Sequence, residues 1–534
     1  MRLVADARAL ARFVGGLKSF LQWRITPEEA RAIVRERLGR RPEMFLRTVE
    51  HGVFRNPRSP YLPLFRRAGI AMGDLEKMAR ADGVEATLHE LRRADVYVTF
   101  EEFKGRRPIV RDGLELPVTA RDFDNPTAGR SFGVRSSGST GRATRTVIDL
   151  DHMIAEVPAK TLETDAVGAV RAPTALWRGV PPAAAGVRNM LFGCAMGNVP
   201  RRWFTPVSSQ QMGASWRTRA ATGVFVRGAA LCGTRLPQPE LVPLDRADVI
   251  ADWAAEALRA EGSCAVRCFV SMAVRVCLAA AERGTDLSGA TFLAGGEPAT
   301  RGKMSVVTDA GARLVPGYAM NELGVIGVGC ARPADANDMH VAKDLTAVIV
   351  RPLQVAGWPA PVDALYLTTL QPHAPKMMLN VETDDCGVIQ RRSCGCPLEE
   401  AGYDEHLLEV RSYRKLTGEG VTLVQTEAVR VLEEVLPGRF GGSPVDYQFL
   451  EEEDQRGITR LSLLVSPRVN LPDEQAVLDV ALRAFRESGK HSAFAATLWE
   501  RGASLRLRRA EPVWNMGGKF APLCVAERLK RARN

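Results

Sequence analysis

Six consecutive small residues, Ser136-Ser137-Gly138-Ser139-Thr140-Gly141, form the segment best suited to binding phosphate. They leave backbone N–H groups free in a curved loop and add hydroxyl donors, which is what phosphate oxygens require. Val134 before the segment and Thr146-Val147-Ile148 after it are typical of strands, so we expect the loop to join two strands. No Gly-Lys-Ser or Gly-Lys-Thr follows, so this is not a Walker loop, and a flexible connection is the alternative interpretation.

A second candidate follows the expected strand Thr291–Leu293. The segment Ala294-Gly295-Gly296-Glu297-Pro298 places two glycines at the end of that strand. Glycines there let a ligand approach the backbone closely, although a plain turn would have the same composition.

An aromatic ring and a carboxylate lie four residues apart in Gly317-Tyr318-Ala319-Met320-Asn321-Glu322. On a loop, Tyr318 could stack on a purine, and Glu322 could hold Mg²⁺ against phosphate oxygens. The alternative is a buried tyrosine beside a solvated glutamate.

Asp385 and Lys519 are two further residues whose side chains would suit a nucleotide-binding site. Asp385 lies in Asn380–Gly387, after the expected strand Leu365–Leu370, and a carboxylate at a strand end commonly accepts ribose hydroxyls. Its alternative is a turn aspartate ahead of Gly387. Lys519 follows two glycines near the C-terminus, and domain motion could carry it to a developing negative charge. Most single lysines are solvated surface residues.

The elements that must position these residues change along the chain. The segment Thr26-Pro27-Glu28-Glu29 predicts a capping box, helical periodicity returns in 74–94, and Val96–Thr99 reads as a short strand. From about 130 to 410, β-branched runs alternate with helical ones, which predicts mixed or parallel sheets covered by helices. After 411, an α-β-β-α-β order predicts a small, separate α+β unit.

We therefore expect an α/β protein, with a large domain of mixed β-sheets covered by helices and a small mobile α+β C-terminal domain. The expected division is a helical N-terminal region over 1–95, the large domain over 96–410 and the small domain over 411–534. More than one domain is also expected from length, because single cores stop growing near ~250–300 residues.

Composition narrows the classes of partner. The net charge is +10, but 62 acidic residues nearly balance 72 basic ones and no run of like charge dominates, so we expect no nucleic-acid partner. The positive excess fits an anionic small molecule. Arg2, Asp6 and Arg8 interrupt any apolar leader, and no segment is apolar enough to span a membrane, which predicts a cytoplasmic protein. Its ten cysteines should then be thiols or metal ligands.

Cysteines form one candidate metal site. Cys394-Gly395-Cys396 is a tight pair of thiols, and two strand-linked loops could bring Cys330 and His340 to it as tetrahedral Zn²⁺ ligands. A CxC motif is a weaker signal than paired CxxC motifs, and buried thiols are the alternative. Cys264, Cys268 and Cys277 have helical spacing and are expected in the core.

Taken in order, these segments resemble the adenylate-forming (acyl-CoA synthetase-like) superfamily, and most closely its phenylacetate–CoA ligase branch. The similarity runs from about 95 to the C-terminus. Residues 136–141 are similar to that family's phosphate loop, 294–298 to its adenine-side loop, 317–322 to its tyrosine-to-glutamate motif, and 365–370 with 381–387 to its ribose-binding strand and turn. The segment His340–Asp344 also resembles that branch, and members of this group carry cysteines similar to those of the candidate zinc site.

The resemblance implies an ATP- and Mg²⁺-dependent ligase that turns a small carboxylic acid into an acyl-adenylate. The acyl group then passes to a thiol such as CoA. It implies catalytic roles for Lys519, for Glu322 as the Mg²⁺ ligand and for Arg411 at the hinge between domains. The implied nucleotide-binding residues are Ser136, Ser137, Gly138, Ser139, Thr140, Gly141, Gly296, Glu297, Pro298, Tyr318, Asn321 and Asp385.

Departures from the family pattern leave two alternatives open. Asn321 replaces a usual threonine, Asp384 replaces a common glycine, and arginines at 142 and 145 stand where a lysine usually closes the phosphate loop. These changes are compatible with a degenerate, non-catalytic nucleotide-binding protein. The other alternative is an acyl-protein synthetase that transfers the acyl group to a cysteine or to a carrier or partner protein. Cys524 would then be the acyl carrier, although a packed helix residue is the simpler interpretation of it.

Overall fold

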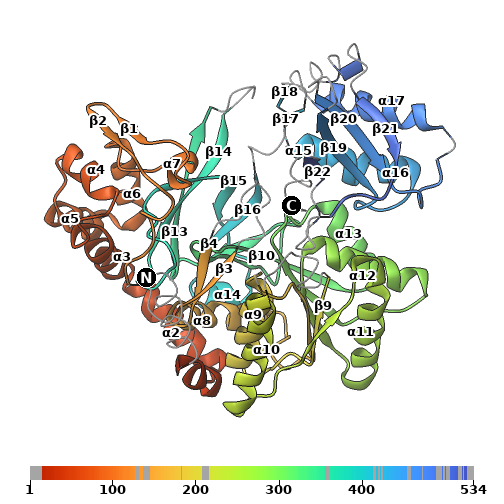
Figure 1. Ribbon diagram of the computed structural model, residues 1–534, viewed down its shortest axis with the longest axis horizontal. Coiled ribbons are helices and arrows are strands. Elements are labelled where there is room, and N and C mark those ends of the chain that lie inside the picture. Colours follow the sequence, from red (N-terminus) through yellow and green to blue (C-terminus); the bar gives the residue numbers. More distant parts are fainter. Residues whose placement is uncertain are drawn as a thin grey trace.

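The structure is a computed structural model of the chain (Figure 1). It describes residues 15–127, 131–135, 145–181, 183–206, 216–354, 361–412, 417–418, 421–422, 425–453, 459–471, 473–488, 496, 499–500, 505–514, 520 and 522–525. The architecture is α/β: a large mixed sheet covered by helices, with a smaller α+β unit at the C-terminal end. This confirms the fold class expected from the sequence.

A twelve-stranded sheet forms the centre of the large part, in the order β13-β14-β15-β16-β12-β11-β10-β9-β8-β5-β6-β7. From β10 to β7 neighbouring strands run parallel, and from β13 to β10 they run antiparallel. The strands are β5 (Thr174–Trp177), β6 (Arg202–Thr205), β7 (Pro239–Leu241), β8 (Cys264–Cys268), β9 (Ala290–Gly295), β10 (Arg313–Met320), β11 (Gly324–Gly329), β12 (Met339–Val341), β13 (Thr346–Leu353), β14 (Val362–Thr369), β15 (Val381–Arg391) and β16 (Glu405–Ser412).

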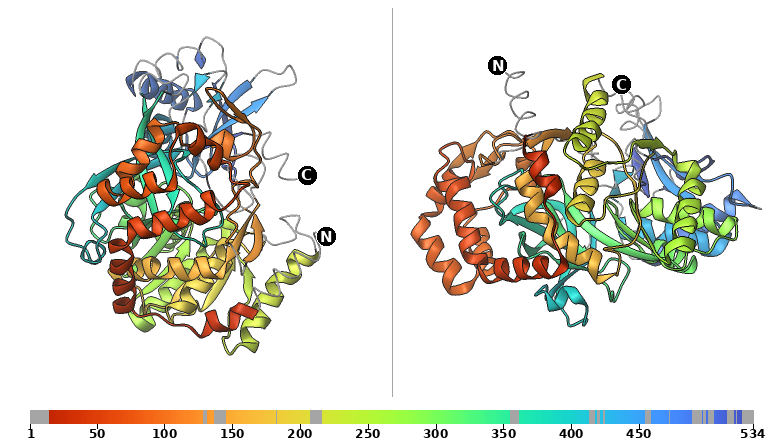
Figure 2. Two further views of the ribbon diagram at one scale, coloured as in Figure 1. Left: turned by 90° about the vertical axis from the view of Figure 1, so that its left-hand side faces the viewer. Right: turned by 90° about the horizontal axis from the view of Figure 1, so that it is seen from below.

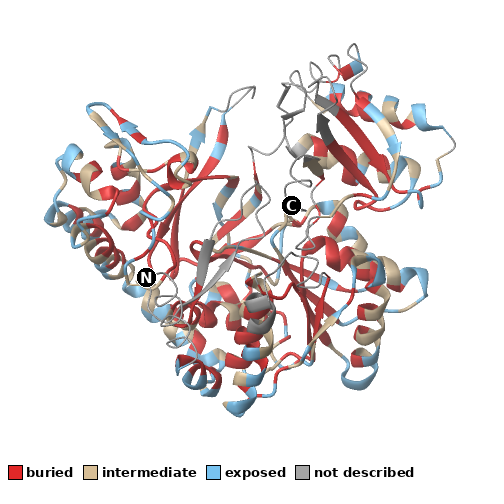
Figure 3. Ribbon diagram, viewed as in Figure 1, coloured by how far each residue is buried: buried red, intermediate tan, exposed pale blue. Residues whose placement is uncertain are grey.

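Helices cover the parallel half of the sheet, as crossover connections between parallel strands require. Their apolar sides pack on strands that are buried along most of their length, drawn in red in Figure 3. These helices are α8 (Leu150–Ala166), α9 (Ala185–Ala195), α10 (Trp216–Leu231), α11 (Ala247–Glu261), α12 (Val270–Glu282) and α13 (Arg301–Asp309).

The N-terminal helices from α3 onward pack against the antiparallel half, where they share a core with β13, β14 and β15, whereas α2 packs against α8. Figure 2 shows α3 to α6 on the side of the molecule opposite the C-terminal unit. They are α2 (Pro27–Gly39), α3 (Arg41–Val49), the π-helix η1 (Glu50–Phe54), α4 (Tyr61–Ala68), α5 (Met72–Asp82) and α6 (Val84–Arg93), followed by α7 (Phe100–Phe103) and the hairpin β1 (Ile109–Arg111) and β2 (Leu114–Leu116).

The C-terminal unit has a four-stranded sheet of order β21-β20-β19-β22 and its own apolar core. Two remaining short hairpins are β3 with β4, described below, and β17 (Thr417–Gly418) with β18 (Val421–Thr422). The strands of the C-terminal sheet are β19 (Tyr447–Glu453), β20 (Thr459–Val465), β21 (Leu505–Arg509) and β22 (Leu523–Val525), and its helices are α15 (Gln425–Arg430), the π-helix η3 (Val431–Val435), α16 (Leu436–Phe440) and α17 (Glu474–Ser488).

Local sequence signals predicted several elements correctly. The capping box at Thr26 is present, with Glu29 reaching back to the Thr26 backbone N–H at 2.8 Å. The predicted helix over 74–94 is wrong in one respect: Gly83 adopts φ +83° and divides it into α5 and α6. The predicted strand Val96–Thr99 is also wrong, because only Val98 bridges to Val381, while Thr99 caps α7.

None of the helices in the described part of the chain combines the length and the apolar character needed to cross a lipid bilayer.

Candidate functional site

The carboxyl ends of β9 and β10 meet at one edge of the parallel sheet, which is where ligands bind in open α/β sheets. Gly295 pairs with Gly317 in the ladder between these strands. A Cβ placed on Gly295 would lie 2.5 Å from the Gly317 carbonyl oxygen, so no other residue fits without moving the backbone. The segments 294–298 and 317–322, which are far apart in the sequence, are therefore neighbours in space.

Tyr318 and Asp385 are joined directly. The Tyr318 hydroxyl donates a hydrogen bond to Asp385 Oδ2 at 2.8 Å, and both residues are half-buried. Burial and the adjacent Asp385 carboxylate raise the pKa of Tyr318 well above its ordinary value, so the hydroxyl stays a donor. The two predicted nucleotide-binding residues thus form one unit.

The structure corrects the local setting of both residues. Tyr318 lies within β10 rather than on a loop. Asp385 lies within the long strand β15, just before the register shift between Cys386 and Val388 in its pairing with β16, rather than in a turn ahead of Gly387. Asp385 faces Ser412 across the ladder. The polar and small residues of 380–387 favour a turn, but pairing of β15 with β14 on one side and β16 on the other keeps this segment extended.

Arg411 lies on β16, directly opposite Cys386 and next to the Asp385–Ser412 pair. Its Nη1 donates to Glu409 Oε2 at 3.0 Å. The structure therefore places this predicted hinge residue one ladder position from the Tyr318–Asp385 unit.

Glu322 follows β10 in the turn that leads to β11, and only 5% of its surface is exposed. Lys104, just after α7, donates from Nζ to Glu322 Oε1 at 2.8 Å. The backbone of Glu322 is also held in place, because its carbonyl oxygen accepts a hydrogen bond from the backbone N–H of Lys376 at 3.0 Å. The predicted Mg²⁺ ligand is thus a buried carboxylate already paired with an ammonium group. Asn321 lies beside it, half-buried, in the same turn.

Glu297 connects the segment 294–298 to the C-terminal part of the chain. Its Oε1 accepts hydrogen bonds from the Ser271 hydroxyl at 2.7 Å and from the Phe520 backbone N–H at 3.1 Å. Gly296 has φ +83°, a conformation that favours glycine, and is exposed, while Pro298 is half-buried.

Several predicted residues lie outside the described residues: Ser136, Ser137, Gly138, Ser139, Thr140, Gly141, Arg142 and Lys519. The strands that flank the first of these segments are described. β3 (Ser131–Arg135) and β4 (Arg145–Asp149) form an antiparallel pair, with Arg135 opposite Arg145. The expectation that the segment joins two strands is confirmed.

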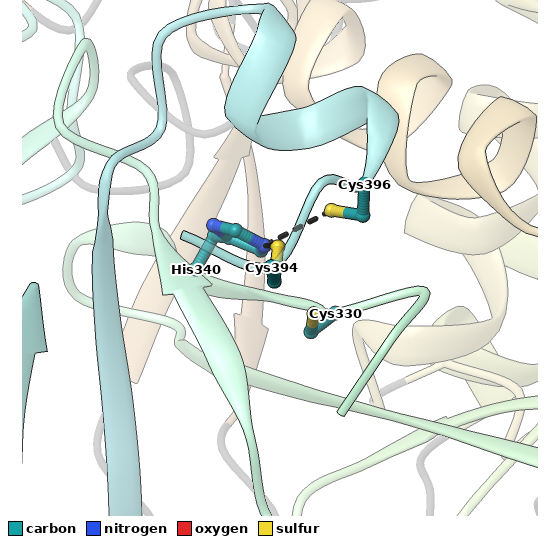
Figure 4. A group of neighbouring side chains, drawn as sticks. All are labelled: Cys330, His340, Cys394 and Cys396. Atoms are coloured by element: carbon teal, nitrogen blue, oxygen red, sulfur yellow. Dashed lines mark hydrogen bonds between the residues drawn. The ribbon is translucent and has the colours of Figure 1, made fainter. Parts of the chain in front are cut away.

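The structure brings the four predicted zinc ligands together (Figure 4). One ligand atom from each of Cys330, His340, Cys394 and Cys396 lies within 4.8 Å of all the others. His340 Nε2 is 3.2 Å from Cys396 Sγ and 3.6 Å from Cys394 Sγ. Ligands at the usual Zn–S and Zn–N distances of about 2.3 and 2.0 Å are separated from one another by about 3.5–3.8 Å. The geometry therefore fits a tetrahedral Cys₃His site.

Neighbouring groups orient these four side chains in the manner expected around a metal. His340 Nδ1 lies 2.7 Å from the Tyr403 carbonyl oxygen and donates to it, which leaves the lone pair of Nε2 facing the thiols. Glu399 accepts the backbone N–H groups of Cys394 and Gly395 at 2.8 and 2.6 Å. These contacts hold the CxC loop in place.

The pKa values of the Cys396 and Cys330 thiols are shifted in opposite directions. A hydrogen bond from Cys330, together with the nearby His340, holds the pKa of the Cys396 thiol far below its ordinary value. The same hydrogen bond, and burial, raise the pKa of Cys330. One thiolate is thus stabilised by its neighbours, and thiolates are the form that binds Zn²⁺.

Some of the remaining cysteines lie in a different type of element from the one predicted. Cys264 and Cys268 are buried as expected, but in strand β8 rather than in a helix, whereas Cys277 lies in α12. Cys524 is half-buried in the strand β22, opposite Leu450, and not in a helix.

Sequence patterns did not identify the two lysine side chains that contact predicted site carboxylates. Lys104 and Lys303 both contact predicted carboxylates, yet neither belongs to a motif. Lys104 and Glu322 are 218 positions apart, so no local spacing relates them.

Comparison with protein-family profiles gives no match. Curated proteins likewise include no relative of this sequence at a significant level. Solved structures do match. One is 2-hydroxyisobutyryl-CoA ligase in the postadenylation state in complex with 2-HIB-AMP, with a TM-score of 0.51, 15% identity, and coverage of 95% of this chain and 91% of that chain. A second is the same ligase with R3-HIB-AMP, with a TM-score of 0.50 at the same identity and coverage. At this identity the likeness shows the fold: the chain is folded like this ligase over nearly its whole length.

Proposed function

We propose that the protein is an ATP-dependent carboxylate ligase that forms an acyl-adenylate. The observation that carries the proposal is the meeting of three predicted nucleotide-binding segments around β9, β10 and β15. Gly295 lies against Gly317, and Tyr318 donates to Asp385. The fold shared with a ligase whose solved complexes hold 2-HIB-AMP and R3-HIB-AMP supports the same function.

In the proposed first step, a carboxylate oxygen attacks the α-phosphorus of ATP, and the bond to the pyrophosphate oxygen breaks. The products are an acyl-adenylate and pyrophosphate. Asp385 is suited to accept ribose hydroxyls, and Tyr318, with its hydroxyl already fixed on Asp385, to offer its ring to adenine. Lys519 would neutralise charge between the carboxylate and the phosphate. Positioning and electrostatics supply most of such catalysis.

In the proposed second step, a thiolate attacks the acyl carbonyl carbon and AMP leaves. CoA is the acceptor that we propose, because the ligase that shares the fold is a CoA ligase. The motif resemblance further suggests the phenylacetate–CoA ligase branch. Mass spectrometry of the protein incubated with MgATP and a library of aryl and aliphatic acids tests the proposal, since the activated acid would appear as its acyl-AMP.

Glu322 fits the magnesium ion that such a reaction uses. Mg²⁺ commonly binds one or two protein carboxylates together with substrate phosphates and water, and it would neutralise phosphate charge here. Glu322 supplies one buried carboxylate beside β10. Because Lys104 already occupies Oε1, a metal ion bound at Glu322 must share or displace that ammonium group.

Replacement of Lys104 should therefore strengthen metal binding. In Lys104→Gln, the Glu322 carboxylate loses a competing cation, and we expect the half-saturating concentration of Mn²⁺, used as a spectroscopic substitute for Mg²⁺, to fall by up to about tenfold. Electron paramagnetic resonance of free Mn²⁺, titrated with a non-hydrolysable ATP analogue present, measures this. The exposed Lys77→Gln on α5 is the matched control. Unchanged or weaker binding in Lys104→Gln would contradict the competition.

We also propose that Cys330, His340, Cys394 and Cys396 hold a structural Zn²⁺ ion. The donor set, the separations and the second layer of hydrogen bonds to Tyr403 and Glu399 all suit a closed tetrahedral site. Such an ion would join three segments of the chain: the end of β11, the strand β12, and the loop between β15 and α14 (Pro397–Glu400).

A further inference from the structure

Arg178 is a buried cation that follows Trp177 at the carboxyl end of β5, and only 7% of its surface is exposed. Its guanidinium donates a hydrogen bond to the Cys268 carbonyl oxygen and lies 4.3 Å from the centre of the Phe269 ring. Because Cys268 is the last residue of β8 and Phe269 follows it, the positive charge lies at the end of β8. This is the edge of the parallel sheet at which β9 and β10 also end.

The Arg178 guanidinium has no ion-pair partner in the part of the chain that the structure describes, and its buried Nε has no hydrogen-bond partner there. Glu297 is close enough to act on it electrostatically, but Oε1 of Glu297 accepts the Ser271 hydroxyl and Oε2 lies 4.0 Å from Lys303 Nζ. Burial lowers the pKa of Arg178 to about 10, so the group is still a cation at neutral pH. An unpaired buried charge destabilises the folded state, and an anion from solution would offset this effect.

The backbone around Arg178 is fixed by packing on both sides. Its N–H donates to the Phe204 carbonyl oxygen at 3.0 Å, and its own carbonyl oxygen accepts the Trp203 indole N–H at 3.0 Å. A Cβ on Gly186, in α9, would meet the Gly179 carbonyl oxygen at 2.5 Å, so α9 packs directly on the residue after Arg178. Arg178 is therefore held in place before any ligand binds, as a specific binding residue requires.

The order of the strands places Arg178 beside the predicted nucleotide-binding residues rather than among them. Tyr318 and Asp385 lie on β10 and β15, whereas the Arg178 guanidinium reaches the end of β8, on the other side of β9. Cys268 pairs with Ala294, near the end of β9. Neighbouring strands are about 4.8 Å apart, so the guanidinium lies about one strand spacing from the end of β9. A nucleotide bound at Tyr318 and Asp385 would leave the ends of β8 and β5 for the acid.

We propose that Arg178 determines which acid is activated by binding a second carboxylate of the substrate, so that the substrate is a dicarboxylic acid. A guanidinium and a carboxylate form two parallel hydrogen bonds, which fix the orientation of the acid as well as matching its charge. One carboxylate is held at Arg178 while the other attacks the α-phosphorus of ATP. The assignment rests on the proposed adenylation function and names the class of acid that this function would use.

The experiment compares dicarboxylic acids with their monomethyl esters, which keep the carbon chain and one carboxylate but lose the second charge. ATP–pyrophosphate exchange is measured with succinate, glutarate, adipate and terephthalate and with the four monoesters. In the wild type, we expect kcat/KM for at least one diacid to exceed that for its monoester by about a hundredfold. In Arg178→Met, this ratio should fall to near unity, because the side chain fills the space without a charge. Arg178→Lys keeps the charge without the planar fork and should give an intermediate ratio.

Two measurements distinguish a binding role of Arg178 from a structural one. Replacement of an unpaired buried charge by an apolar side chain relieves an unfavourable burial, so the melting temperature of Arg178→Met should not fall by more than about 2 °C. A diacid added without ATP should raise the melting temperature of the wild type but not that of Arg178→Met. Arg201→Met removes an arginine from an exposed pair with Glu261 and is the matched control, which should keep the diacid preference.

Three outcomes would overturn the assignment. The first is a diacid preference that persists in Arg178→Met, or a wild type that activates monocarboxylic acids in preference to diacids. The second is a large fall in the melting temperature of Arg178→Met with equal loss of activity towards diacid and monoester, as expected of a structural arginine. The third is a raised KM for ATP in Arg178→Met, which would place the residue at the nucleotide. If no acid supports exchange, the proposed function fails, and stabilisation by diacids alone then decides whether Arg178 binds a carboxylate.

Discussion

Replacement of Lys519 by alanine is expected to lower the kcat of adenylation by about 10²–10³-fold, the loss typical when one preorganised group at a developing charge is removed. ATP binding should remain, because Tyr318, Asp385 and Glu322 are unchanged. Pre-steady-state measurement of acyl-adenylate formation, combined with calorimetric titration of ATP, separates the two effects.

Two variants sharpen this prediction. Lys519→Arg keeps the charge but changes its geometry, so it should retain more activity than Lys519→Ala. Lys77→Ala removes an exposed ammonium group from α5 and should leave the rate unchanged. An adenylation rate in Lys519→Ala within about threefold of the wild type would remove Lys519 from the mechanism.

The second large effect concerns the cluster of three thiols and a histidine. In Cys396→Ser, we expect bound zinc to fall from about one ion per chain to almost none, because the hydroxyl is a far poorer ligand than the thiolate. The free energy of unfolding should fall by several kcal/mol, since binding of a structural metal contributes directly to folding. Inductively coupled plasma mass spectrometry and denaturant unfolding measure the two quantities.

The control for this prediction is Cys232→Ser, which changes a half-buried thiol outside the cluster. It should keep its zinc and nearly all of its stability. Purified wild-type protein that lacks zinc, and that neither binds added Zn²⁺ nor gains stability from it, would show that these side chains are packed thiols.

Local sequence patterns predicted those elements that depend on interactions between residues close together in the chain. The capping box at Thr26 depends on residues close in the chain and was predicted, and the two successive strands of the α-β-β-α-β order expected after 411 are the hairpin of β19 and β20. The sequence also predicted that Cys330, His340, Cys394 and Cys396 could come together, although a CxC motif is a weak signal, and the structure brings these four side chains together. For Val96–Thr99, in contrast, β-branched residues suggested a strand, but tertiary contacts leave Val98 with a single bridge.

The electrostatics of the site depend on distant pairings that the sequence does not encode locally. Lys104 follows α7, which packs against β15, and it meets Glu322 of the turn after β10 although the two residues are 218 positions apart. Lys303 is a helix residue without a motif, yet it lies between Glu297 and Glu433. Asp385 remains a predicted ribose-binding residue, and its place inside β15 follows from pairing with β14 and β16.

The most direct test of the account is acid-dependent ATP–pyrophosphate exchange by the full-length protein, with a panel of aryl and aliphatic carboxylic acids and Mg²⁺. The account predicts exchange with at least one acid, dependent on that acid and lost in Lys519→Ala. No exchange with any acid, together with no calorimetric binding of ATP, would contradict it.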